Sequence, residues 1–135
     1  MKTKLGTIRG LKNPASSSFL GIPYAAHNRF QPPKIMPEWS DTLDATLPGP
    51  VPPQLPSRLA SVMGDFETKY DENCLSLNIW TPGEKGDDKP VIIWIHGGAF
   101  VSGSGSLPWY DGQNLSENQD LVVVGINYRL GALGF

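Results

Sequence analysis

Two short segments of the chain are apolar at nearly every position. Residues 91–95 read Val-Ile-Ile-Trp-Ile, and residues 121–126 read Leu-Val-Val-Val-Gly-Ile. A strand without polar alternation is typical of one that is buried on both faces, as in the centre of an α/β sheet. Residues 74–81 alternate apolar and polar side chains, which predicts a half-buried strand. The helical candidates, at 57–63 and 112–119, are short, so the predicted sheet lacks helices to cover it and the fold is expected to be incomplete.

The N-terminal part of the chain predicts a small antiparallel β unit. Residues 3–10 alternate weakly, and residues 18–24 are apolar and aromatic. Asn13-Pro14 lies between them and indicates a turn. A second turn, charged and glycine-containing, is expected over residues 83–89.

Residues 31–56 contain eight of the thirteen prolines. Proline removes a backbone donor and disfavours helix at the preceding residue, so this stretch is predicted to be a long extended loop. Trp39, Leu43 and Leu47 are the side chains expected to anchor it. A long irregular loop is unusual in a compact unit unless it lies over a larger body.

Composition places the chain among globular proteins and gives no sign of nucleic-acid binding. Of its 135 residues, 39% are hydrophobic and 18% are charged, with a formal net charge of −2. No basic stripe or zinc-ligand spacing is present. The single cysteine, Cys74, permits no intrachain disulfide and favours a reducing compartment. The sequence shows neither a signal-peptide core nor an apolar run of membrane-spanning length, so a cytoplasmic protein without metal or cofactor is expected.

One motif contains residues of a kind that can take part in catalysis. The apolar strand at 91–95 runs directly into His96-Gly97-Gly98-Ala99. Ester hydrolysis places negative charge on the former carbonyl oxygen, and aligned backbone N–H groups stabilise that charge. Small side chains let the carbonyl approach, and an HGGG-type loop supplies such donors in lipases and esterases. The alternative is a tight turn after a strand, with His96 as a structural histidine. Gly-Gly alone favours that alternative, and the surrounding residues decide between the two.

Further motifs accompany this one along nearly the whole chain, from about Gly6 to Phe135. They are Gly21-Ile-Pro-Tyr-Ala25, Arg29-Phe30 with Pro32-Pro33, Glu72-Asn-Cys-Leu-Ser-Leu-Asn-Ile-Trp-Thr-Pro82, Trp94-Ile-His-Gly-Gly-Ala-Phe100, Tyr110-Asp-Gly112 and Asn127-Tyr-Arg-Leu-Gly131. In this order and spacing they resemble the type B carboxylesterase family. The resemblance implies that residues 1–135 form the N-terminal part of one α/β-hydrolase domain, with a small antiparallel β unit and the first central strands.

The resemblance also implies roles for the motif residues. Gly98 and Ala99 would be the oxyanion donors, and Gly97 would shape the turn. Residues 100–107 would border a substrate pocket. The serines within 102–106 are expected in a mobile, solvated rim.

Three charged residues match positions of the family pattern, and one segment departs from it. Arg29 and Glu72 match an ion pair that ties the N-terminal loop to a strand entrance. Arg129 matches a position whose aspartate partner would lie beyond Phe135. Residues 49–53 read Gly-Pro-Val-Pro-Pro, without the first cysteine of many relatives, so Cys74 would lack the family's disulfide partner.

The catalytic serine expected for this family is missing from the sequence. No serine has the Gly-x-Ser-x-Gly context, and the two histidines, His27 and His96, both have other interpretations. The expected function is therefore carboxylic ester hydrolysis, with this chain inactive unless the C-terminal segment of the fold completes it. The alternatives are a non-catalytic binding module of the same fold and a truncated remnant without activity.

Overall fold

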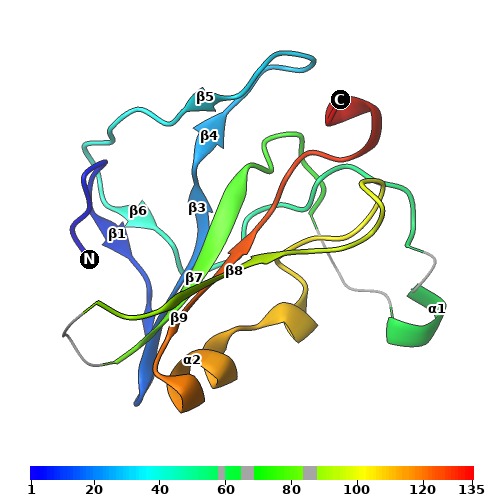
Figure 1. Cartoon of the computed structure of the whole chain (residues 1–135). Coiled ribbons are helices and arrows are strands. Elements are labelled where there is room, and N and C mark those ends of the chain that lie inside the picture. The colour runs from blue at the N-terminus through cyan, green and yellow to red at the C-terminus, as the bar shows by residue number, and fades with distance from the viewer. Residues whose placement is uncertain (58–59, 65–68, 84–87) are drawn as a thin grey trace.

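A five-stranded mixed sheet organises the chain in the computed structural model, which describes residues 1–57, 60–64, 69–83 and 88–135 (Figure 1). The strand order is β2-β3-β7-β9-β8. Neighbours are antiparallel except for β8 and β9, which run parallel with Ile93 opposite Val124. The strands of this sheet are β2 (Leu11–Lys12), β3 (Ser16–Pro23), β7 (Ser76–Pro82), β8 (Val91–Ile95) and β9 (Val122–Ile126). The fold is thus α/β, as the sequence predicts.

The two apolar segments both form strands, but they occupy different places in the sheet. β9 is central, and its residues alternate between buried and partly buried. β8 is the edge strand, and all five of its residues are exposed, Ile93 by 63%. Residues 91–95 thus have the apolar pattern of a strand buried on both faces, yet they are exposed in this chain, as expected for a sheet that lacks covering helices. Among the described strands, β9 alone lies beside β8.

The N-terminal turn is confirmed, but its strands pair differently from the prediction. The amide of Asn13 donates to the carbonyl of Ser16, closing a hairpin between β2 and β3. Instead of pairing with residues 18–24, β1 (Ile8–Arg9) runs parallel to β6 (Leu43–Asp44). A long loop can bring back a distant segment as a partner, which local alternation does not reveal.

The proline-rich stretch is an irregular loop that carries two short strands, β5 (Lys34–Ile35), which pairs with β4 (Ala25–Ala26), and β6. Trp39 and Leu43 pack against a small core, as expected. That core consists of Ile8, Phe19 and Ala45. Leu47 does not anchor the loop, because its side chain is 76% exposed.

Helices are short, as the sequence predicts. α2 (Gln113–Gln119) packs against β3, β7 and β9, and Gly112 precedes it. A Cβ at Gly112 would lie 2.6 Å from Cγ1 of Val123, so glycine lets the helix approach the sheet closely.

α1 (Ala60–Met63) falls within the predicted helical turn at 57–63, of which residues 58–59 lie outside the described part. Residues 84–87 of the expected turn also lie outside it. Two 3-10 turns, η1 (Pro108–Tyr110) and η2 (Gly131–Leu133), complete the elements.

The exposed edge of β8 predicts self-association of the 135-residue polypeptide when it is produced by itself. A strand edge with unpaired backbone N–H and C=O groups and apolar side chains can form β pairing with another chain. Replacing Ile93→Lys places a charge on this strand, so the sedimenting species should become smaller. Leu47→Lys, at an exposed position outside the described strands, should leave the sedimentation profile unchanged. A native polypeptide that is monomeric at micromolar concentration and melts cooperatively would contradict this expectation.

Candidate functional site

The predicted oxyanion loop follows β8 at the carboxyl ends of the two parallel strands. In α/β sheets, this end is where ligands bind. β8 leads into His96, and β9 leads into Asn127 and Tyr128, so both segments emerge at the same end of the sheet (Figure 1). The amide of Gly131 donates to the carbonyl of Phe100 over 2.7 Å, which ties the loop to η2.

The loop has an unusual backbone. Gly98, Ala99 and Phe100 all have positive φ angles, of 123°, 53° and 61°. For residues with a side chain, this left-handed region costs about 1–3 kcal/mol and tends to be found at functional sites. A Cβ at Gly98 would overlap the carbonyl oxygen of Ser102, whereas one at Gly97 would meet nothing within 4 Å. The positive φ angles therefore begin at Gly98, and the turn-shaping role that the family resemblance gives to Gly97 stays a prediction.

The loop is held through its carbonyl groups, while its amides stay free. The carbonyl of Gly98 accepts from the amides of Val101 and Ser102, at 3.0 and 3.1 Å. Within the described part of the chain, the amides of Gly98 and Ala99 donate to no acceptor. Residues 97–100 are also exposed. Two adjacent N–H groups are thus available to an external acceptor.

The buried His96 side chain supports the start of the loop. Its side chain stacks on Tyr128, with ring centroids 4.4 Å apart, and its Nδ1 lies 2.8 Å from the carbonyl oxygen of Gly97. The hydroxyl of Tyr128 donates to the carbonyl of His96 over 2.7 Å. Burial lowers the pKa of His96, which favours the neutral ring. This arrangement gives His96 the structural role that the sequence left open. The contribution of Tyr128 has no signal in sequence spacing, because it depends on the pairing of β8 with β9.

The serine-containing rim is ordered by buried hydrogen bonds, which corrects the expectation of a solvated segment. Ser104 is fully buried, and its hydroxyl donates to Oδ1 of Asn127 over 2.8 Å. The same oxygen accepts from the amide of Gly105 at 2.8 Å, while Nδ2 of Asn127 donates to the hydroxyl of Ser106 at 3.0 Å. Glycine and serine suggested mobility, but their small size here allows close packing against β9. Asn127 was a motif residue without an assigned role.

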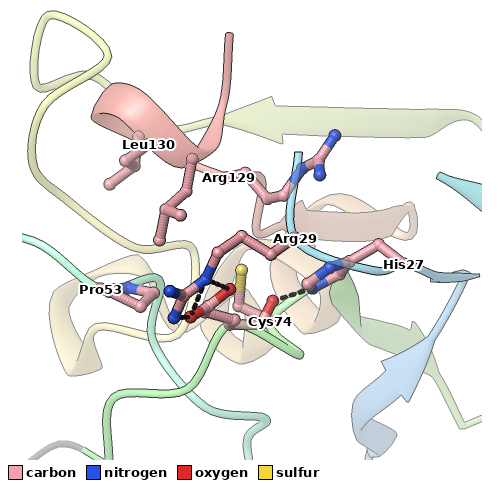
Figure 2. A pocket seen from close by; sticks show the side chains of 8 residues that line it. His27, Arg29, Pro53, Cys74, Arg129 and Leu130 are labelled. Carbon is pink, nitrogen blue, oxygen red and sulfur yellow. Dashed lines mark hydrogen bonds and ion pairs between the residues drawn. The ribbon is translucent and has the colours of Figure 1, made fainter. Parts of the chain in front are cut away.

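A second polar cluster lines a surface hollow (Figure 2). The predicted ion pair between Arg29 and Glu72 is present, with Nε of Arg29 3.0 Å from both carboxylate oxygens. Hydrogen bonding to Arg29 lowers the pKa of Glu72. Cys74 is a free, buried thiol beside them, and burial raises its pKa to about 11. Arg129 donates to the carbonyl of Gln31 over 3.0 Å.

The described residues contain no cluster of three or more histidine, cysteine, aspartate or glutamate side chains that could hold a metal ion. None of the described helices has the length and apolar character required to cross a bilayer.

Comparison with known proteins agrees with the sequence motifs. The carboxylesterase family model matches residues 1–135. The para-nitrobenzyl esterase of Bacillus subtilis (strain 168) is 40% identical over 137 residues, which cover 98% of this chain and 28% of the relative. Acetylcholinesterase of Bungarus fasciatus is 38% identical over 148 residues, covering 100% of this chain and 24% of the relative.

A solved structure of a PNB esterase superposes with a TM-score of 0.90 and 41% identity, over 99% of this chain and 28% of that one. The architecture is therefore part of an α/β-hydrolase fold. The chain spans about a quarter of the length of the relatives that it matches.

Burial of His96 predicts a pH dependence of stability. Because its pKa is lowered in the folded state, the unfolded chain binds this proton more readily, and the free energy of unfolding falls as pH drops below about 6.5. Measured in the less associated Ile93→Lys background, His96→Gln should therefore flatten the change in urea midpoint between about pH 8 and pH 5.5. His27 is present in both proteins and serves as an internal control. An equally steep change in the variant would rule out His96 as its source.

Proposed function

The chain belongs to the carboxylesterase family, and from this premise we propose that it supplies the oxyanion-binding loop of a serine carboxylic ester hydrolase. The donors are the amides of Gly98 and Ala99. The observation that carries the proposal is the strained turn at Gly98–Phe100, which leaves both amides exposed and without an internal acceptor. An ordinary tight turn after a strand does not require two consecutive non-glycine residues with positive φ.

The proposed chemistry begins when a serine oxygen attacks the ester carbonyl. The carbonyl π electrons move onto oxygen, a histidine accepts the serine proton, and a tetrahedral intermediate forms. The amides of Gly98 and Ala99 donate to the new oxyanion, which stabilises it more than the neutral carbonyl. Collapse expels the alcohol, which takes the proton, and water then hydrolyses the acyl-enzyme.

The structure around the loop supports this role. The Ala99 methyl group is small and Gly98 has no Cβ, so a substrate carbonyl can approach the two proposed donor amides. The buried His96 side chain supports the start of the loop through its stacking on Tyr128 and the contact of its Nδ1 with the carbonyl oxygen of Gly97. Oriented dipoles that need no rearrangement during the reaction are the main source of such stabilisation.

The nucleophile, the acid and the catalytic histidine of the proposed reaction come from outside residues 1–135. No serine here lies in a Gly-x-Ser-x-Gly turn. The partner that completes the site is therefore the C-terminal segment of the same fold, and the substrate is a small carboxylic ester. The lone buried Cys74 fits a cytoplasmic setting, because a reducing compartment keeps such a thiol free.

A chimeric enzyme tests the proposal. Residues 1–135 replace the matching segment of the Bacillus subtilis para-nitrobenzyl esterase, and hydrolysis of a p-nitrophenyl ester is followed by release of p-nitrophenolate. A folded, monomeric chimera should hydrolyse the ester. A chimera that folds but has no activity above the uncatalysed rate would contradict the proposal.

Two glycine variants of this chimera distinguish the oxyanion loop from a general turn. Gly98→Ala cannot keep the loop backbone, because its methyl group overlaps Ser102 and its φ is positive, so kcat/KM should fall by about 10²- to 10³-fold. Gly97→Ala is the matched control, since its methyl group meets no atom within 4 Å, and it should lose less than about tenfold. Equal losses in the two variants would contradict the assigned donors.

A further inference from the structure

Gln54 makes a paired contact with one residue of the rim that follows the oxyanion loop. Its Oε1 accepts from the amide of Gly103 at 2.7 Å, and its Nε2 donates to the carbonyl of Gly103 at 2.8 Å. A side-chain amide has one donor and one acceptor in a plane, so it can satisfy both backbone groups of a single residue. Gln54 and Gly103 are 49 positions apart in the sequence, and this contact joins the proline-rich loop to the candidate site.

The proline-rich segment before Gln54 is fixed in position. Val51 and Pro52 are buried, and the amide and carbonyl of Val51 bond to Lys69 and Asp71. Proline also restricts φ, which lowers the freedom of the backbone that presents Gln54. Nε2 of Gln54 donates additionally to the carbonyl of Pro52 over 3.1 Å, which restricts the side chain itself.

Gly103 transmits this constraint to the oxyanion loop. A Cβ at Gly103 would lie 2.5 Å from the carbonyl oxygen of Gly97 and 2.6 Å from Nδ1 of His96, so the backbones are already in close contact. The preceding residue, Ser102, packs its carbonyl against Gly98 and donates its amide to the Gly98 carbonyl. A shift of Gly103 would therefore displace Gly97 or Gly98.

We propose that Gln54 is a positioning residue that sets the geometry of the oxyanion donors through Gly103. This inference rests on the proposed function of the loop. The two hydrogen bonds between Gln54 and Gly103 connect the proline-rich loop to the residues that follow the strained turn. It assigns a role to the segment at residues 49–53, in which this sequence has proline and valine without the cysteine of many relatives.

The test uses the full 135-residue chain within the esterase chimera. Gln54→Ala removes both hydrogen bonds, and Gln54→Glu removes the donor while facing a carboxylate toward the carbonyl of Gly103. Gln31→Ala is the matched control, because the exposed Gln31 side chain bonds only Asn28 among the described residues. Two quantities are measured: hydrogen exchange by mass spectrometry in peptides covering residues 97–107, and kcat and KM for the p-nitrophenyl ester.

Both Gln54 variants should exchange faster over residues 97–107 and lose roughly tenfold in kcat, with KM changed less than about twofold. Exchange in α2 and all properties of Gln31→Ala should match the unmodified chimera. Unchanged exchange over residues 97–107 would overturn the proposal, and so would equally faster exchange in α2 or faster exchange with unaltered kcat. An inactive unmodified chimera would instead count against the proposed function, while the exchange data still decide whether Gln54 holds the loop.

Discussion

The strained backbone of Gly98, Ala99 and Phe100 is the constraint on which the candidate site depends. Two residues with side chains adopt left-handed φ angles there, at a cost of about 1–3 kcal/mol each, so the surrounding structure must enforce the turn. It does so through carbonyl groups: that of Gly98 is bonded within the loop, and that of Phe100 is bonded to Gly131. Within the described part of the chain, the amides of Gly98 and Ala99 donate to no acceptor and so are available to an anionic oxygen. The strain is thus coupled directly to the proposed function.

The parallel pairing of β8 and β9 explains how distant segments meet at this turn. The pairing brings Tyr128 under the ring of His96, and it brings Asn127 against the rim that contains Ser104. Asn127 is buried, and both ends of its side chain are hydrogen-bonded, so it orders the rim without leaving a polar group unsatisfied. The proline-rich loop contributes Gln54 and is the third segment that supports the site. Support from three separate segments is consistent with a site that must be rigid before substrate arrives.

The sequence predicted much of the fold but not the contacts that shape the site. Apolar runs and alternation located β7, β8 and β9, because these patterns reflect local periodicity. The family resemblance correctly predicted the Arg29–Glu72 pair. Anchoring by Leu47 was wrong, because exposure depends on which segments become neighbours. The contacts of Gln54, Tyr128 and the buried Ser104 could not be predicted for the same reason, because their partners lie far away in the sequence. The roles of Gly98 and Ala99 as donors remain predictions.

The most direct test of the central claim is a crystal structure of the esterase chimera with a trifluoromethyl ketone bound covalently to the catalytic serine. This adduct carries an oxyanion like that of the tetrahedral intermediate. The account predicts that the oxyanion lies about 2.7–3.1 Å from the amide nitrogens of both Gly98 and Ala99, with the turn unchanged. A well-ordered adduct in which these amides turn away from the oxyanion, or bond to other protein groups, would contradict it.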